Sequence, residues 1–337
     1  MNDMLPDGTI VITGAAGLIG SQLVSALHAQ SRDLVAVDFC GRDERPGYLT
    51  GVTLRDWLHP DALDGWLDAH ADDVAAVIHM GAISDTTETD EALLEANNVR
   101  FTLNLWERAR ARNWRFLYAS SAATYGDGAN GFHDSDELDD LARLKPLNLY
   151  GWSKHRTDIA ILESIARGEG APDVWAGFKF FNVYGPNEEH KGAMRSLVRK
   201  IVPRIQRGET VKLFRSHRAD YEDGAQERDF IYVKDAIAPV IRALGSDRLG
   251  GLFNVGTGEA RSFRDLALAT FAALGVPADI DYVDMPENIR DQYQYRTAAD
   301  TAKASAHGLQ GKVHTLEEGV ADYVATLTTG TADPISP

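Results

Sequence analysis

The chain has 337 residues, of which 44% are hydrophobic and 25% are charged. This length allows one large α/β unit or two domains, and the composition is ordinary for a globular protein. The formal net charge is −16, so the chain has no electrostatic attraction to phosphate backbones and we expect no nucleic-acid partner. The single cysteine, Cys40, excludes an intrachain disulfide framework and is typical of a reducing compartment.

The chain begins with MNDMLPDG, a polar and acidic segment. It lacks the basic and then apolar order of a signal peptide. The longest nearly apolar run, VAAVIHMGAI, is too short to cross a bilayer. We therefore expect a cytoplasmic protein with no membrane partner. We also expect no metal site.

Short apolar runs alternate with longer amphipathic runs through the first half of the chain. Strands are predicted at 9–15, 33–38, 74–82, 115–121 and 174–185, and helices at 17–30, 91–113 and 150–166. Buried strands that alternate with helices are typical of a parallel sheet covered on both faces. The sequence therefore predicts a doubly wound parallel sheet of the Rossmann-like α/β class.

The alternation becomes less regular after residue 185. An amphipathic segment at 194–208 precedes a stretch, 211–233, that is strand-like at both ends, and helices are predicted at 262–275 and 316–327. We predict a dinucleotide-binding domain over residues 1–180 and a smaller α/β substrate domain over 181–330. The segment from about 229 to 260 is expected to return to the large domain.

Three glycines, Gly14, Gly17 and Gly20, lie between the first predicted strand and the first predicted helix. In a dinucleotide-binding loop such glycines make the tight turn, let the backbone approach a pyrophosphate and let the helix pack on the strand. Their spacing is G-x-x-G-x-x-G, and three glycines alone are weak evidence of binding. Their place between strand and helix is what the motif requires, and favours a cofactor loop over an ordinary turn.

The residues after the second predicted strand bear on which dinucleotide binds. Asp38 ends this strand, where a carboxylate can bind the hydroxyls of the adenine ribose and would repel a 2′-phosphate. Arg42 and Arg45 follow closely and could bind that phosphate. The residues therefore leave NAD and NADP open.

Tyr150 and Lys154 are four residues apart in the first turns of a predicted helix, so their side chains lie on the same face. An ammonium group beside a phenol favours the phenolate, which can act as the base for an alcohol next to a hydride acceptor. The spacing alone is also that of an ordinary surface pair. Ser120 and Ser121 end a predicted strand, where a hydroxyl can hold the reacting oxygen. Because the glycine loop, the serines and the Tyr–Lys pair occur in this order, we favour a catalytic site.

Four stretches together, TGAAGLIG, YASSAATYG, YGWSK and FNVYGP, resemble the extended short-chain dehydrogenase/reductases of the NAD(P)-dependent epimerase/dehydratase family, which act on nucleotide sugars. GAISDTTETD, FKFFNVYGPNEEHKG and RDFIYV are similar to a narrower group, the epimerases that invert C6 of the heptose in ADP-heptose. The resemblance extends from about residue 9 to residue 327.

This resemblance implies an epimerase with a nucleotide-sugar substrate (ADP-heptose), NADP as its cofactor and a homo-oligomeric, pentameric assembly. It implies four catalytic residues: Ser121, Tyr150, Lys154 and, as a second base, Lys191. The predicted cofactor contacts are Gly14, Gly17, Leu18, Ile19, Gly20, Asp38, Phe39, Met80, Gly81, Ala82, Ile83, Ser84, Asn97, Tyr150, Lys154, Val183 and Lys191. The predicted substrate contacts are Ser84, Asn182, Ala193, Lys200, Phe214, Arg215, Ser216, Arg228 and Tyr293.

An epimerase of this kind oxidises a carbinol to a ketone and returns the hydride to the opposite face. One base can serve one orientation of the oxygen and a second base the inverted orientation. Lys191 can act in this way only if burial or a nearby positive charge lowers its pKa. Without the resemblance, Lys191 would be read as a phosphate contact or a solvated loop lysine.

Some positions depart from the pattern of the heptose epimerases. Ala193 stands where a serine is usual and Lys200 where histidine is frequent, and the loop SHRADYEDGAQE is longer than expected. These positions belong to the nucleotide-sugar side of the site. They leave the exact sugar and the base of the nucleotide open.

Three other functions compete with this interpretation. A dehydratase of the same superfamily carries an Asp–Glu pair just after the catalytic serine, where this chain has Ala122 and Ala123. A C4 epimerase of UDP-hexoses is a closer alternative, and Lys191 is the residue that argues against it. A non-catalytic dinucleotide sensor would be free to lose Tyr150 or Lys154, and this chain has both.

Overall fold

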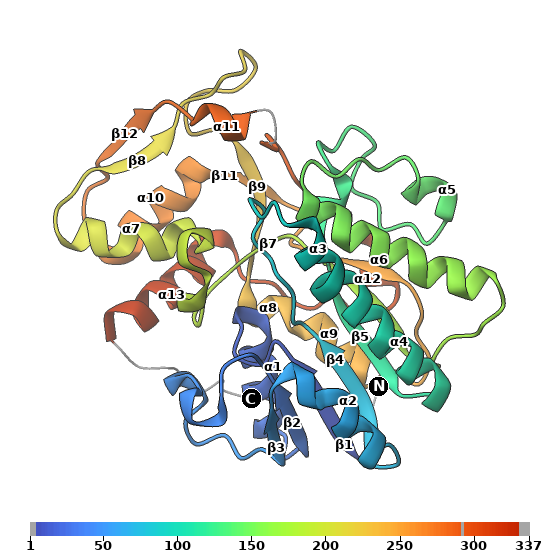
Figure 1. The fold of residues 1–337 in the computed structure, drawn as a ribbon. Helices are drawn as coiled ribbons and strands as arrows, with labels where there is room; N and C mark the ends of the chain where they lie inside the picture. The colour runs from blue at the N-terminus through green and yellow to red at the C-terminus, as the bar shows by residue number, and fades with distance from the viewer. Residues whose placement is uncertain (1–4, 291–292, 330–337) are drawn as a thin grey trace.

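The computed structural model describes residues 5–290 and 293–329 (Figure 1). Its largest sheet has seven strands in the order β3-β2-β1-β4-β5-β6-β10, and every neighbouring pair is parallel. The strands are β1 (Thr9–Thr13), β2 (Leu34–Val37), β3 (Asp56–Leu58), β4 (Val74–His79), β5 (Arg115–Ser121), β6 (Trp175–Phe180) and β10 (Leu252–Val255). This order reverses direction between β1 and β4, so the predicted doubly wound, Rossmann-like sheet is confirmed.

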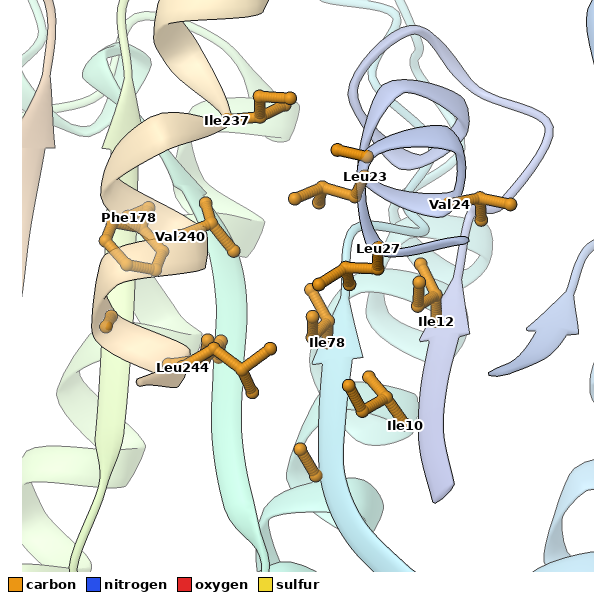
Figure 2. Close-up of a cluster of buried hydrophobic side chains, with 14 of the residues drawn as sticks. Ile10, Ile12, Leu23, Val24, Leu27, Ile78, Phe178, Ile237, Val240 and Leu244 are labelled. Carbon is orange, nitrogen blue, oxygen red and sulfur yellow. The ribbon is translucent and has the colours of Figure 1, made fainter. Parts of the chain in front are cut away.

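Helices cover both faces of this sheet. One face carries α1 (Leu18–Ala29), α8 (Val233–Ala236) and α9 (Ala238–Leu244), and the other carries α2 (Pro60–Ala69), α4 (Phe101–Arg112) and α6 (Leu149–Ala166). Because side chains alternate along a strand, Ile10 and Ile12 of β1 pack in one core, whereas Val11 packs in the other. Figure 2 shows the first core, with Leu27 of α1 and Val240 of α9 directed at the strands.

A smaller group of elements lies at the upper left of Figure 1. It contains a three-stranded sheet, β11-β9-β7, a parallel pair, β12-β8, and three longer helices. Its elements are β7 (Asn182–Tyr184), β8 (Val211–Phe214), β9 (Glu227–Tyr232), β11 (Ala260–Ser262), β12 (Ile280–Val283), α7 (Leu197–Gln206), α10 (Phe263–Leu274) and α13 (Leu316–Thr329). Its helices pack on one another through buried apolar side chains such as Val202, Leu266 and Val320.

The prediction of one strand over 174–185 was wrong. The chain turns at Phe181, whose N–H donates to Val255 O (3.0 Å) and whose C=O accepts from Val183 N (2.9 Å). That i to i+2 contact is typical of a γ-turn. It ends β6 in the large sheet and starts β7, which pairs with β9 instead.

The segment from 229 to 260 is divided between the two groups of elements. It starts as β9 in the small sheet, and then α9 and β10 pack within the large sheet, where β10 pairs with β6. The division into domains at residue 180 stays a prediction. Within the described residues, no helix combines the length and the apolar character needed to cross a membrane.

Several short helices complete the chain. They are the helices α3 (Glu91–Leu94), α5 (Leu138–Leu141), α11 (Glu287–Arg290) and α12 (Ala302–Ala306), and the 3₁₀ turns Arg42–Glu44, Gly47–Leu49, Ala122–Tyr125 and Glu189–Met194. A π-helical turn, Glu95–Arg100, joins α3 to α4. Three of these turns, Arg42–Glu44, Glu95–Arg100 and Glu189–Met194, carry residues of the site described next.

Candidate active site

A cavity of about 510 Å³ opens at the carboxyl ends of the strands of the large sheet. It is lined by residues that end or follow β1, β2, β4, β5 and β6. The reversal of strand order between β1 and β4 leaves a crevice at this edge, which is where open α/β sheets bind their ligands. The fold therefore brings the loops that were predicted to form the site around one cavity.

The glycine loop between β1 and α1 lies against this cavity. Gly14 has a φ of +66°, and a Cβ at this position would lie 2.6 Å from Gly81 N. A Cβ at Gly20 would lie 2.0 Å from Gly14 O, so glycine is required at both positions. Gly17 is the N-cap of α1, and no side chain in the described residues caps this helix end. The open N–H groups of its first turn suit a pyrophosphate.

Acidic groups line the end of the cavity next to β2. Asp38 Oδ2 accepts from Ala16 N and Asp38 Oδ1 from Phe39 N, both at 2.8 Å, so two backbone amides fix the carboxylate. Glu44 also lines the cavity, whereas Arg42 and Arg45 are outside its lining. Arg45 instead donates to Val52 O at 3.3 Å. The local charge that a ligand meets at this end is negative.

Asn98 holds the loop 80–84, which follows β4 and lines the cavity. Its Oδ1 accepts from Ile83 N at 2.9 Å, and its Nδ2 donates to Ile83 O at 2.9 Å and to Ser153 Oγ at 3.0 Å. Asn98 is fully buried in the π-helical turn, next to Asn97, which lines the cavity. The extra residue of a π turn redirects side chains and recurs at functional sites. Here the π turn lets Asn98 connect the loop 80–84 to α6.

Tyr150 enters the cavity from the first turn of α6. Asn148 caps this helix by accepting from Gly151 N at 2.8 Å. The Ser121 hydroxyl, at the end of β5, lies close enough to the Tyr150 phenol to lower its pKa. Burial raises the pKa of Tyr150, and the Ser121 hydroxyl opposes this rise. Burial lowers the pKa of Lys154 to about 8, and Asp158 opposes this fall. Without a bound ligand, these two pKa shifts therefore favour the neutral phenol of Tyr150 and the neutral amine of Lys154.

A buried ion pair lies behind Tyr150 and Lys154. Asp158, one helical turn beyond Lys154 on α6, accepts from Lys179 Nζ of β6 at 2.6 Å and from Tyr118 and Ser120 of β5 at 2.9 and 2.7 Å. The side chains of Asp158 and Lys179 are 0% and 1% exposed. Both charges are paired and hydrogen-bonded, so Asp158 links α6 to β6 through the ion pair and to β5 through the two hydroxyls.

Lys191 enters the cavity from the turn Glu189–Met194. This turn is anchored by Glu188, which is fully buried and accepts from Ser196 N at 2.7 Å and from the Tyr323 hydroxyl at 2.8 Å. Burial lowers the pKa of Lys191, and the carboxylate of Glu188 opposes the shift. Lys191 therefore meets the condition set for a second base, that burial lowers its pKa.

The structure brings the predicted cofactor contacts together. All of them line the cavity: Gly14, Gly17, Leu18, Ile19, Gly20, Asp38, Phe39, Met80, Gly81, Ala82, Ile83, Ser84, Asn97, Tyr150, Lys154, Val183 and Lys191. Ser121 lines it as well. Their roles in binding and catalysis stay predictions.

Most predicted substrate contacts form a second group outside the cavity. Only Ser84 lines the cavity itself, among the described residues. Arg228 is 7% exposed at the start of β9, with its guanidinium 4.9 Å from the ring centre of Tyr293. Asn182, Phe214, Arg215 and Ser216 lie on β7 or at the end of β8. Asn182 pairs in register with Phe230, two residues from Arg228.

Two further predicted substrate contacts belong to other elements. Ala193 and Lys200 are exposed, on the Glu189–Met194 turn and on α7.

Within the second group, Arg215 is within ion-pair distance of Asp223 and Asp284, at 3.9 and 3.4 Å. Its charge is therefore already shared with two carboxylates of the protein.

Several residues of the site were not predicted from the sequence. Asp158 continues the spacing of Tyr150 and Lys154 by four residues, and that spacing could have indicated it. His190 directly precedes Lys191 and also lines the cavity. For Glu44, Asn98 and Lys179 the sequence carries no signal, because only the packed structure brings them to the site.

The fold and the cavity define the class of protein: an α/β protein with a dinucleotide-binding loop and a tyrosine–lysine pair in the same cavity. The model of the NAD dependent epimerase/dehydratase family matches residues 10–256. The chain belongs to this family.

Individual relatives and solved structures give a more specific similarity than the family model does. The chain is 44% identical over 328 residues to the ADP-L-glycero-D-manno-heptose-6-epimerase of Nitratidesulfovibrio vulgaris, covering 96% of this chain and 99% of the relative. It is 26% identical to the enzyme of that name from Helicobacter pylori, with a TM-score of 0.74 and coverage of 97% and 99%. It is also 26% identical to the UDP-glucose 4-epimerase of Thermus thermophilus in complex with NAD, with a TM-score of 0.75 and coverage of 96% and 100%.

Proposed function

We propose that the protein inverts C6 of the heptose in ADP-D-glycero-D-manno-heptose and gives ADP-L-glycero-D-manno-heptose. The observation that carries this proposal is the presence of two proton-exchanging groups, Tyr150 and Lys191, from different elements in one cavity with the glycine loop. The names of the relatives support the substrate. Ala122 and Ala123, which follow Ser121 without an acid, oppose a dehydratase.

The cavity suits a nicotinamide dinucleotide. The first turn of α1 offers uncapped N–H groups to a pyrophosphate, and Asp38 offers a fixed carboxylate to ribose hydroxyls. A bound nicotinamide supplies the hydride acceptor for oxidation of C6 and the hydride donor for its reduction. Because reduction follows oxidation in each turnover, the dinucleotide is regenerated and does not need to leave.

The side chains of this protein move the protons. In one orientation of the sugar, the phenolic oxygen of Tyr150 exchanges a proton with the C6 oxygen, while Lys154 stabilises the phenolate and the Ser121 hydroxyl holds the reacting oxygen. In the inverted orientation, Lys191 Nζ exchanges the proton. Oxidation leaves one of these groups protonated and reduction takes a proton from the other, so Tyr150 and Lys191 regain their starting states by exchanging one proton each with water.

Purified protein is expected to carry about one nicotinamide dinucleotide per chain and to turn over ADP-heptose without added cofactor. Native mass spectrometry, followed by identification of the released dinucleotide and of any retained nucleotide sugar, measures both the stoichiometry and the sugar. Full activity in a preparation free of dinucleotide would overturn the epimerase proposal. Inversion of C4 in a UDP-hexose, with ADP-heptose unchanged, would move the function to the C4 epimerases.

The identity of the dinucleotide is a separate proposal. Resemblance implies NADP, but the end of the cavity next to β2 is lined by Asp38 and Glu44, with Arg42 and Arg45 outside the lining. Two carboxylates repel a 2′-phosphate and can accept from ribose hydroxyls. These contacts favour NAD, and NAD in the similar Thermus thermophilus structure supports the same choice.

Asp38→Asn is expected to lower the ratio of the NADP dissociation constant to that of NAD by about tenfold or more, because it removes a negative charge beside the 2′ position. The ratio is the useful quantity, since loss of one backbone hydrogen bond weakens the binding of both dinucleotides. Calorimetric titration of cofactor-depleted protein measures it. Asp43→Asn, at an exposed position outside the lining, is the control. Tighter binding of NADP than NAD by the unmodified protein would contradict the proposal.

We also propose, from resemblance, a cytoplasmic homo-oligomer with five subunits. The single cysteine supports a reducing compartment. Sedimentation of the purified protein measures the assembly.

A further inference from the structure

His190 lies in the cavity beside the glycine loop. It lines the same space as Gly14 and Gly17, and a Cβ at Gly17 would lie 3.9 Å from His190 Nε2. The residue is exposed to the cavity, and in the described part of the chain no hydrogen bond or ion pair holds its ring. Gly17 is also the N-cap of α1. An imidazole is therefore free to bind whatever the uncapped first turn of this helix binds.

We propose that His190 binds the pyrophosphate of the nicotinamide dinucleotide, so that the turn Glu189–Met194 holds the cofactor and the second base together. The inference rests on the proposed function, because that function requires a dinucleotide in this cavity. It adds a contact from outside the large sheet. The glycine loop holds the pyrophosphate from one side, and His190, next to Lys191 in the sequence, holds it from the turn.

The position of this turn is fixed at its base. The buried carboxylate of Glu188 accepts from Ser196 N, at the start of α7, and from the Tyr323 hydroxyl of α13. Glu188 thereby ties both ends of the turn to the smaller group of helices. Met194 lines the cavity beside His190 and Lys191. A turn that is anchored in this way presents its side chains to the cavity in a defined geometry.

The charges around His190 decide how its binding depends on pH. The pKa of His190 is lowered overall, and the largest cause is partial loss of hydration of the ring where it stands against the cavity wall. Lys191, on the same turn, also lowers this pKa, while Asp38 at the end of β2 and Glu188 and Glu189 on its own segment raise it. A bound pyrophosphate would raise this pKa, since a nearby anion favours imidazolium. By linkage, the protonated form holds the dinucleotide more tightly. Retention is therefore strongest at low pH and weakens as the pH rises through the pKa of the bound form.

The test is the rate at which NAD leaves the protein, measured from about pH 5 to pH 8. Protein loaded with NAD is diluted into buffer that contains a coupled dehydrogenase, which reports the released NAD. In the unmodified protein, release should become faster as the pH rises. His190→Gln should release NAD about tenfold faster at the low end of this range and with little dependence on pH, because a charge-assisted hydrogen bond is lost.

Two further variants separate charge from shape. His190→Lys keeps a positive charge until about pH 10, so it should release NAD slowly with little dependence on pH over the range. His307→Gln, at an exposed position outside the cavity lining, should behave as the unmodified protein. Since His190 is exposed, none of these substitutions removes a core side chain.

Each outcome bears on one proposal or the other. Release from His190→Gln at the unmodified rate would overturn the role of His190 and leave the proposed function standing. Faster release that keeps the original pH dependence would also overturn it, because the titrating charge would then lie elsewhere. If the unmodified protein neither carries nor takes up a nicotinamide dinucleotide, the proposed function itself fails.

Discussion

Replacing Tyr150 with phenylalanine is expected to lower the turnover of ADP-heptose by about 10²- to 10⁴-fold, the usual contribution of a positioned general acid or base. The substitution removes the hydroxyl near Ser121 and keeps the ring that lines the cavity. The pKa of Tyr150 is raised by burial, so an active phenolate depends on positive charge from Lys154 and from an oxidised nicotinamide. Steady-state assay of C6 inversion in each variant measures the effect.

The stability of Tyr150→Phe should change by no more than about 1 kcal/mol, because only a hydroxyl is removed and the ring keeps its packing. Denaturant unfolding checks this point. Tyr282→Phe, on β12 outside the cavity lining, is the matched control. Near-normal turnover by Tyr150→Phe would mean that Tyr150 and Lys154 are only a structural pair.

Lys191→Met is expected to abolish complete inversion, with a loss of about 10²- to 10⁴-fold, and to spare part of the redox half-reaction served by Tyr150. Methionine keeps much of the length of the side chain and removes the only group in the turn Glu189–Met194 proposed to exchange a proton with the sugar. An aldehyde analogue of the sugar separates the half-reactions, since its hydrate is oxidised to an acid and its carbonyl is reduced to an alcohol. The yields of acid and alcohol are measured separately.

The double variant provides a stricter test of the same pair. If Tyr150 and Lys191 serve one cycle, each single change stops it, and the double change should cost little more than the worse single change. Lys312→Met, at an exposed position outside the cavity lining, is the control. Inversion at the unmodified rate by Lys191→Met would remove the main local support for a heptose 6-epimerase. The function would then become that of an unspecified nucleotide-sugar epimerase.

Most of the large sheet was predictable because its strands carry a local signal. In β1, all five residues are apolar or threonine and all are buried, so a short apolar run before a glycine loop was sufficient. β3 and α2 were missed, since Asp56–Leu58 is only three residues long and the helix after it buries only Leu63, Trp66 and Leu67. Segment 174–185 was predicted as one strand because its apolar pattern continues through the turn at Phe181.

The residues of the candidate site also fall into those that carry a local sequence signal and those that do not. Glycines, Asp38 and the Tyr150–Lys154 spacing could be predicted, because each depends on residues close together in the chain or at the end of a predicted strand. The resemblance, and not the spacing, indicated Lys191. Neither could indicate that Glu188 would anchor the turn that carries it, because Tyr323 is 135 residues away in the sequence.

The sequence alone determined the fold class, and it predicted the dinucleotide loop and Tyr150 as a base, because these follow from local periodicity, glycine positions and helical spacing. Only the tertiary structure decided which charges and which proton-exchanging groups line the same cavity. It buried the Asp158–Lys179 pair behind the serines, left Arg42 and Arg45 outside the cavity lining, and set His190 beside the glycine loop. These arrangements depend on contacts between segments far apart in the chain, and local sequence pattern does not specify such contacts.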